Sequence, residues 1–255
     1  MLLEIKKLTV TVKSSGFKAV DGISLSVDMG RPLLILGQSG SGKTMICRAL
    51  FGLTNSADFD VSGQIIFDGN DILSMDSKSR RKLYGSDIAL VPQNPMTAFD
   101  PSYKLGHQLA ETYRLHNKSS AKEAKAAVLE ALKKAGLERS EAVWASYPYM
   151  LSGGMLQRAA VASAVMNLPR LMIADEPTTA LDAEHRIAVT DMLRSLCGSS
   201  AVIIVTHDFA VAKRFGGYAY VMKNGVFVEQ GDIDKIIAAP ENEYTKELLD
   251  AALLI

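Results

Sequence analysis

Hydrophobic and polar residues alternate along the first part of the chain. Leu3, Ile5 and Leu8 begin a period of about two, which returns at residues 23–27 (ISLSV) and in the segment 58–68. This alternation is typical of half-buried antiparallel strands. We therefore expect an antiparallel β subdomain in the N-terminal part of the chain.

Other short segments are apolar at every position. They are residues 33–36 (LLIL), 171–174 (LMIA) and 202–205 (VIIV), and residues 88–91 (IALV) resemble them. A strand that is apolar on both faces fits the middle of a parallel sheet covered by helices. Proteins of this α/β class bind ligands at the carboxyl ends of such strands. The pattern predicts a mostly parallel core sheet.

The middle of the chain changes character. Residues 95–165 contain no convincing strand, and residues 120–136 are rich in Ala, Leu, Lys and Glu with Gly136 as a stop. We expect an inserted α-helical subdomain at about 94–166. The core would then comprise about 1–93 and 167–235, all within one domain that spans residues 1–255.

The last part of the chain predicts a hairpin and a helical tail. Asn224-Gly225 is a strong turn signal, and residues 218–229 predict the two strands that it joins. Two short helices, separated by Pro240, should follow in a C-terminal tail at about 236–255.

Composition excludes several classes of protein. Hydrophobic residues make up 48% of the chain, and 28 Lys and Arg balance 28 Asp and Glu. A disordered chain has fewer apolar residues, and a nucleic-acid-binding domain usually has excess positive charge. No apolar run reaches the roughly 18–20 residues that span a bilayer, and the first residues lack the apolar core of a signal peptide. Cys47 and Cys197 are too few for a disulfide scaffold, so we expect reduced thiols in the cytoplasm.

Residues 37–44 (GQSGSGKT) carry the strongest motif, because they match the phosphate-loop pattern G-x-x-x-x-G-K-[ST]. The segment follows the apolar strand at 33–36 and precedes an apolar helix expected at 45–51, which makes a chance glycine-serine loop a poor alternative. Backbone N–H groups would bind phosphate oxygens, Lys43 would hold the β- and γ-phosphates, and Thr44 would bind Mg²⁺. The expected phosphate-binding residues are Gly37, Gln38, Ser39, Gly40, Ser41, Gly42, Lys43 and Thr44.

Two acids, Asp175 and Glu176, follow the apolar segment 171–174. Acids at the end of a buried strand must be solvated, paired or close to a metal ion. Beside a phosphate loop, Asp175 would join the Mg²⁺ shell and Glu176 would polarise the attacking water. Taken alone, the pair could equally be an acidic turn.

Residues 151–158 (LSGGMLQR) place Ser152, Gly153 and Gly154 ahead of an apolar helix expected at 159–166. A helix N-terminus of this kind is suited to an anion. The segment resembles the signature motif of ATP-binding-cassette (ABC) ATPases. In that family it faces the phosphate loop of a second subunit across a bound ATP, so the resemblance implies a P-loop NTPase fold, ATP and Mg²⁺.

The resemblance also implies roles for several residues whose function the local sequence alone does not decide. Gln93 stands at the position of the family's Q-loop glutamine, a Mg²⁺ ligand; on its own it could be a surface amide. Residues 180–182 (ALD) look like the D-loop, which includes Asp182. His207 looks like the switch histidine, although it could also be a core or capping histidine. The catalytic residues implied are Glu176, Gln93 and His207, and the metal site implied is Thr44, Gln93 and Asp175.

The family also stacks an aromatic side chain on adenine, upstream of the phosphate loop. Phe17 is the nearby candidate, although the family more often has tyrosine there and the spacing to the strand at Ile23 is short.

Further segments narrow the resemblance. Residues 92–101 (PQNPMTAFDP), 175–182 (DEPTTALD) and 244–249 (YTKELL) resemble the peptide/nickel transport group of ABC importers. The length of the chain and residues 152–158 (SGGMLQR) are most similar to the nickel-import ATP-binding subunit of that group. This implies a subunit that hydrolyses ATP to power uptake of nickel, a metal chelate or short peptides. It would bind peripherally at the cytoplasmic side of the membrane. Its partners would be two permease subunits, a second ATPase subunit of a different chain and, indirectly, an extracytoplasmic substrate-binding protein.

Two alternatives stay open at this stage. One is an ABC-type ATPase that acts on nucleic acid or ribosomes, and the other is an exporter cassette. The first kind usually carries two cassettes or a long coiled coil, whereas this chain has one cassette and no net charge. We therefore expect no nucleic-acid partner.

Overall fold

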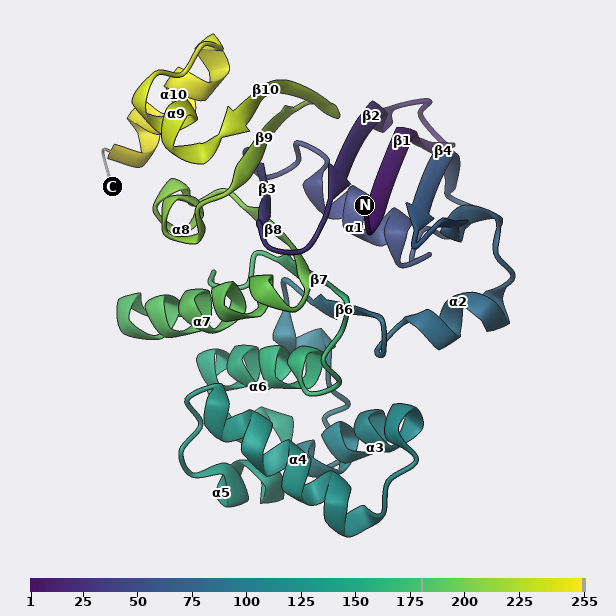
Figure 1. Cartoon of the computed structure of the whole chain (residues 1–255), viewed down its shortest axis with the longest axis vertical. Coiled ribbons are helices and arrows are strands. Elements are labelled where there is room, and N and C mark those ends of the chain that lie inside the picture. The colour runs from purple at the N-terminus through teal and green to yellow at the C-terminus, as the bar shows by residue number, and fades with distance from the viewer. Residues whose placement is uncertain (180, 254–255) are drawn as a thin grey trace. The chain divides into compact units, whose positions relative to one another are not determined.

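The computed structural model describes residues 1–179 and 181–253 (Figure 1). Its internal contacts divide the chain into two compact units. The first unit comprises Met1–Arg81 and the chain from Cys197 onward, and the second comprises Lys82–Leu196. The sequence boundaries expected for a helical subdomain, about 94–166, stay a prediction.

The first unit contains a four-stranded antiparallel sheet in the order β2-β1-β4-β5. Its strands are β1 (Leu3–Val12), β2 (Lys18–Val27), β4 (Phe59–Phe67) and β5 (Asn70–Asp71). The alternation along β1 follows burial, because Leu3, Ile5 and Leu8 are almost completely inaccessible. The expected N-terminal antiparallel subdomain is confirmed, and β1, β2 and β4 lie side by side in Figure 1.

The first unit also contains strands of the core sheet. They are β3 (Leu33–Leu36), β8 (Ala201–Thr206), β9 (Tyr218–Lys223) and β10 (Val226–Asp232). β3 pairs in parallel with both β8 and β9, and β10 pairs with β9 as the expected hairpin. Every residue of β3 and β8 is buried, which is why both strands are apolar except at Thr206, the last residue of β8.

Helices complete the first unit. They are α1 (Lys43–Leu50), α8 (Phe209–Phe215), α9 (Ile233–Ala238) and α10 (Glu243–Leu253), while α2 (Ser77–Leu83) crosses the boundary between the units. α9 and α10 are separated near Pro240, as the sequence predicts, and lie beside β10 in Figure 1. α8 has no counterpart among the elements predicted from the sequence.

The second unit combines two parallel strands with helices. The strands are β6 (Ile88–Val91) and β7 (Leu171–Asp175). The helices are α3 (Leu105–Asn117), α4 (Ala121–Lys134), α5 (Ser140–Ala145), α6 (Gly153–Val165) and α7 (Ala183–Ser195). No strand lies between β6 and β7, so residues 95–165 are free of strands as predicted. Short 3₁₀ turns occur at Ile72–Ser74, Pro95–Thr97, Pro148–Met150 and Leu196–Gly198.

No helix in the described part of the chain is long and apolar enough to cross a bilayer. The helices of the second unit instead bury their apolar faces against one another. Leu105, Leu109, Val128, Leu132 and Leu156 come from α3, α4 and α6 and form one buried cluster. This packing holds α6, which carries the signature segment at its start.

A capping box fixes the start of α4. The Ser120 hydroxyl accepts a hydrogen bond from the Glu123 N–H at 3.2 Å, and the Glu123 carboxylate accepts one from the Ser120 N–H at 2.8 Å. These bonds hold the pKa of Glu123 below its ordinary value. They also satisfy N–H groups that have no partner within the helix.

We expect Ser120→Ala to lower the free energy of unfolding by about 1 kcal/mol, because it removes this cap. Trp144 packs against the cluster that includes α4, so its fluorescence in a urea titration reports the loss. Ser119→Ala is the matched control, since the Ser119 hydroxyl oxygen is buried without a hydrogen-bond partner in the described structure. Equal midpoints for the two variants would contradict the capping argument.

Candidate functional site

The phosphate loop connects β3 to α1 and is packed directly against neighbouring backbone. Gly37 has φ 150° and Gly42 has φ 110°, a region that residues with a side chain rarely adopt. A Cβ at Gly37 would overlap the carbonyl oxygen of Met222, and a Cβ at Gly42 would overlap that of Ala19. Both positions therefore require glycine for reasons of space as well as conformation.

The side chain of Lys43 closes the loop. Its ammonium donates hydrogen bonds to the carbonyl oxygens of Gly37 at 2.7 Å and Gln38 at 2.8 Å, and the residue is only 5% exposed. The hydroxyl oxygen of Ser41 is also buried, and it has no hydrogen-bond partner within residues 1–179 and 181–253. A buried cation and an unpartnered hydroxyl in a glycine loop fit a bound phosphate.

The helix that follows the loop adds to this site. α1 begins at Lys43, and its N-cap is Gly42, which has no side chain to cap the first amides. The positive end of the helix dipole therefore faces the loop. Thr44 lies in the first turn and is exposed, so its hydroxyl is accessible to a ligand. The helix starts two residues before the predicted 45–51.

His207 lies at the same sheet edge as the phosphate loop. Leu36 pairs with Thr206 across the parallel strands β3 and β8, so Gly37 and His207 both follow directly at the carboxyl ends. His207 is exposed there. The expected adenine-stacking residue, Phe17, lies between β1 and β2 in the same unit, and it is 56% exposed.

In the second unit, Asp175 and Glu176 stand at the carboxyl end of β7. Both are buried, with 4% and 6% of their surface exposed. Val91 pairs with Ala174 across the parallel strands, so Gln93, two residues beyond β6, follows at the same edge. The structure thus places the segment that carries Gln93 at the same sheet edge as Asp175 and Glu176.

The backbone of Glu176 is strained. Its φ of 50° lies in the left-handed region, which costs a residue with a side chain about 1–2 kcal/mol. The Thr179 hydroxyl donates a hydrogen bond to the Glu176 carboxylate at 3.3 Å. This hydrogen bond holds the carboxylate to the segment that follows β7.

The signature segment forms the start of α6. Ser152 is the N-cap, and its hydroxyl accepts a hydrogen bond from the Met155 N–H at 3.2 Å. Gly153 and Gly154 form the first turn, so the helix begins six residues before the predicted 159–166. The side chain of Gln157 donates to the Pro92 carbonyl oxygen at 3.5 Å, which links α6 to the segment that carries Gln93.

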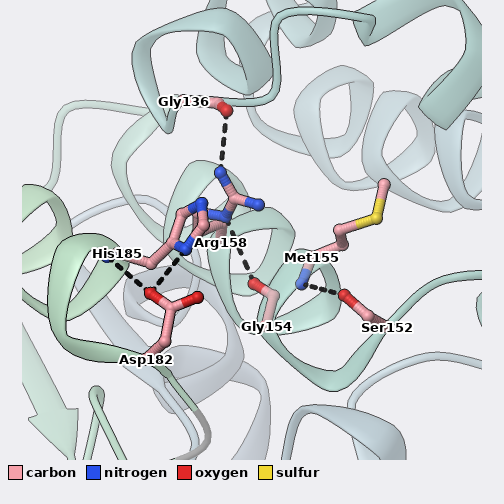
Figure 2. A network of polar contacts seen from close by, with 7 residues as sticks. All are labelled: Gly136, Ser152, Gly154, Met155, Arg158, Asp182 and His185. Atoms are coloured by element: carbon pink, nitrogen blue, oxygen red, sulfur yellow. Dashed lines mark hydrogen bonds and ion pairs between the residues drawn. The ribbon is translucent and has the colours of Figure 1, made fainter.

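Polar contacts are made by the D-loop aspartate and, separately, by residues of the signature helix (Figure 2). Asp182 caps α7, and one carboxylate oxygen meets the His185 N–H at 2.9 Å and the His185 Nδ1 at 2.7 Å. Arg158 on α6 donates to the carbonyl oxygens of Gly136 at 2.8 Å and Gly154 at 3.4 Å. Ala180, the first residue of the expected D-loop, lies outside the described residues.

The charges of Asp182 and Arg158 influence each other's pKa. The hydrogen bonds from the His185 N–H and ring lower the pKa of Asp182, so its carboxylate stays ionised. Partial burial lowers the pKa of Arg158, and the negative charge of Asp182 opposes that change. Sequence reasoning assigned no role to Arg158 or His185. The spacing of His185 three residues after a helix-capping aspartate is the signal that would have found it.

The expected site residues therefore belong to both units. The phosphate loop, Phe17 and His207 lie in the first, and Gln93, the signature residues, Asp175, Glu176 and Asp182 lie in the second. No group of three or more His, Cys, Asp or Glu side chains in the described part of the chain is arranged to hold a metal ion. The chemical roles of the expected residues stay predictions.

Comparison with known proteins identifies relatives over nearly the whole chain. Residues 20–179 match the family model described as ABC transporter. The chain is 39% identical to a metal-staphylopine import system ATP-binding protein of Staphylococcus aureus, over 97% of this chain and 92% of that protein. It is 38% identical to a dipeptide transport ATP-binding protein of Haemophilus influenzae, over 97% of this chain and 76% of that protein.

Solved structures show the same fold. A dimeric structure of a bacterial ABC transporter cassette has a TM-score of 0.82 at 27% identity, covering 91% of this chain and 99% of that one. A dimeric ATP-binding cassette in a post-hydrolysis state, bound to ADP and Pi, has a TM-score of 0.81 at 27% identity with the same coverage.

We expect Gly42→Ala to abolish ATP binding, because the new methyl group would displace the loop from the Ala19 carbonyl. Isothermal titration with ATP measures the loss. Gly22→Ala is the control, since Gly22 has φ 64° with no neighbouring atom within 4 Å of an added Cβ. The control carries backbone strain of about 1 kcal/mol without an overlap. ATP binding by Gly42→Ala at the affinity of the control would contradict this account of the loop.

Proposed function

Because this chain belongs to the ABC transporter family, we propose that it is the ATP-hydrolysing subunit of an importer of the peptide/nickel group. The observation that carries the proposal is the phosphate loop, in which a buried Lys43 and an unpartnered Ser41 hydroxyl face a glycine backbone. A relative named as part of a metal-staphylopine import system, which matches almost the whole chain, supports the direction of transport, and a relative named as a dipeptide transport protein supports the transport group. They give no support to a nucleic-acid or ribosome factor.

ATP binds at the phosphate loop in this proposal. Lys43 leaves the carbonyl oxygens of Gly37 and Gln38 and pairs with the β- and γ-phosphates. Backbone N–H groups at the start of α1 and the Ser41 hydroxyl complete the phosphate contacts. Phe17 stacks on adenine with its exposed ring.

Mg²⁺ fits the oxygen atoms that the expected ligands offer. Thr44 supplies a hydroxyl, Gln93 an amide oxygen and Asp175 a carboxylate, which are the hard donors that Mg²⁺ prefers. When bound, Mg²⁺ neutralises charge on the β- and γ-phosphates. Thr44 belongs to the first unit and the other two ligands to the second.

Hydrolysis depends on Glu176 and a second cassette. The buried Glu176 carboxylate orients the attacking water and takes its proton. His207 contacts the γ-phosphate, and Ser152, Gly153 and Gly154 offer a helix N-terminus to the γ-phosphate held by the partner subunit. Asp182 lies beside the signature helix and borders the same interface. The signature residues of one subunit contact the γ-phosphate only while the other subunit holds ATP. The two subunits therefore close around ATP and separate after hydrolysis.

The assembly comprises two permease subunits, this chain, a second ATPase subunit of a different chain and an extracytoplasmic substrate-binding protein that delivers the cargo. The chain binds peripherally at the cytoplasmic side of the membrane and needs no nucleic acid. Its cargo is a nickel or other metal chelate, or a short peptide.

We expect Glu176→Gln to bind ATP like the unaltered chain while its kcat falls by about 10²–10⁴-fold, the contribution of a general base. Isothermal titration with ATP and phosphate release separate the two effects. Glu138→Gln removes an exposed carboxylate from the same unit and is the matched control. Turnover of Glu176→Gln at the rate of the control would assign the base to another residue.

The transport function has its own test. We expect the neighbouring genes to encode two permeases, a second ATPase and a substrate-binding protein. The purified binding protein is titrated with Ni²⁺, metal chelates, and di- to oligopeptides. Tight binding of metal or chelate identifies a metal importer, and binding of peptide alone identifies a peptide importer. The absence of permease genes would count against import.

A further inference from the structure

The C-terminal helix contacts the phosphate loop directly. The backbone N–H of Gln38, the second residue of the loop, donates a hydrogen bond to the phenol oxygen of Tyr244 at 3.2 Å. Tyr244 lies in the first turn of α10 and is only 6% exposed. The segment 244–249 marks the importer group in the sequence, but the proposed reaction gives it no role.

The contact gives a loop amide a side-chain acceptor. The Gln38 N–H lies beyond Leu36, the last residue of β3 that pairs with a neighbouring strand. The Tyr244 phenol supplies that acceptor from a segment 206 residues away. Phenylalanine would fill the same space without the oxygen.

The Tyr244 ring is also held on its face. The ammonium of Lys223 lies 4.4 Å from the ring centroid, a cation–π contact. Lys223 ends β9, next to the turn in which the Gly225 N–H donates to the Ser41 carbonyl oxygen at 2.9 Å. The hairpin and α10 therefore hold the phosphate loop at two points, Ser41 and Gln38.

The position of α10 is itself fixed by a carboxylate on β10. Glu229 accepts hydrogen bonds from the N–H groups of Glu241 at 2.9 Å and Asn242 at 3.1 Å. The Asn242 side chain then accepts one from the Tyr244 N–H at 3.0 Å. A continuous series of contacts thus runs from β10 through α10 to the phosphate loop.

We propose that Tyr244 is a positioning residue for ATP binding. Its hydroxyl holds the Gln38 amide, and so sets the entry of the loop whose later amides and Lys43 receive the phosphates. The inference rests on the proposed ATPase function and extends it to a residue outside the phosphate loop. The contact that Tyr244 makes is with the backbone of the phosphate loop, so its effect falls on ATP affinity and leaves the chemical step unchanged.

Tyr244→Phe tests the role of the hydroxyl. We expect the KM and Kd for ATP to rise about threefold to tenfold, the value of one hydrogen bond. We expect kcat to stay within about twofold, because transition-state contacts are kept. Hydrogen exchange at the Gln38 amide should become faster. Tyr218→Phe is the matched control, since the Tyr218 hydroxyl makes no hydrogen bond among the described residues and lies in the same unit.

Glu229→Gln tests the series of contacts without touching Tyr244. The substitution weakens the hydrogen bonds that hold the start of α10. We therefore expect the KM for ATP to rise, as it does for Tyr244→Phe, while kcat is unchanged. Glu241→Gln is its control, because that side chain makes no hydrogen bond in the described structure. A Tyr244→Phe variant whose KM and Gln38 exchange match those of Tyr218→Phe would overturn the inference, as would a fall in kcat at constant KM. An unaltered chain that binds no ATP would instead overturn the proposed function.

Discussion

The phosphate loop depends on close contact between backbone and backbone. Gly37 and Gly42 approach the carbonyl oxygens of Met222 and Ala19 so closely that neither position has room for a Cβ. The shape of the loop therefore depends on the positions of β2, β3 and β9. The order of strands in the first unit, with β3 between β8 and β9, is therefore a condition for the phosphate site.

Parallel pairing explains how distant motifs meet. In the first unit, the register of β3 and β8 places the phosphate loop and His207 at one sheet edge. In the second, the register of β6 and β7 does the same for the segment of Gln93 and the acids Asp175 and Glu176. These strands are apolar and largely buried, so their polar side chains stand at or just beyond the strand ends, as Thr206 and Asp175 do.

Local patterns predicted most of the strands, the phosphate loop and the helical middle of the chain, because periodicity and turn residues act over a few neighbours. The predicted helix at 159–166 was too short, since Ser152 caps α6 and the two glycines join its first turn. The contact of Tyr244 with Gln38 had no local signal, because it spans 206 residues. The left-handed backbone conformation of Glu176 is equally invisible in the sequence.

The expected site residues carry the chemistry, but other residues hold them in place. His185 fixes Asp182, Gln157 reaches the segment of Gln93, and Tyr244 fixes Gln38. Gln157 and Tyr244 each make one such hydrogen bond and His185 makes two. One hydrogen bond is worth about 1 kcal/mol, which is enough to change an affinity severalfold without abolishing activity. Chains with the same site residues can therefore differ in ATP affinity through the residues that support them, and the contact at Gln38 is the one that acts on the phosphate loop itself.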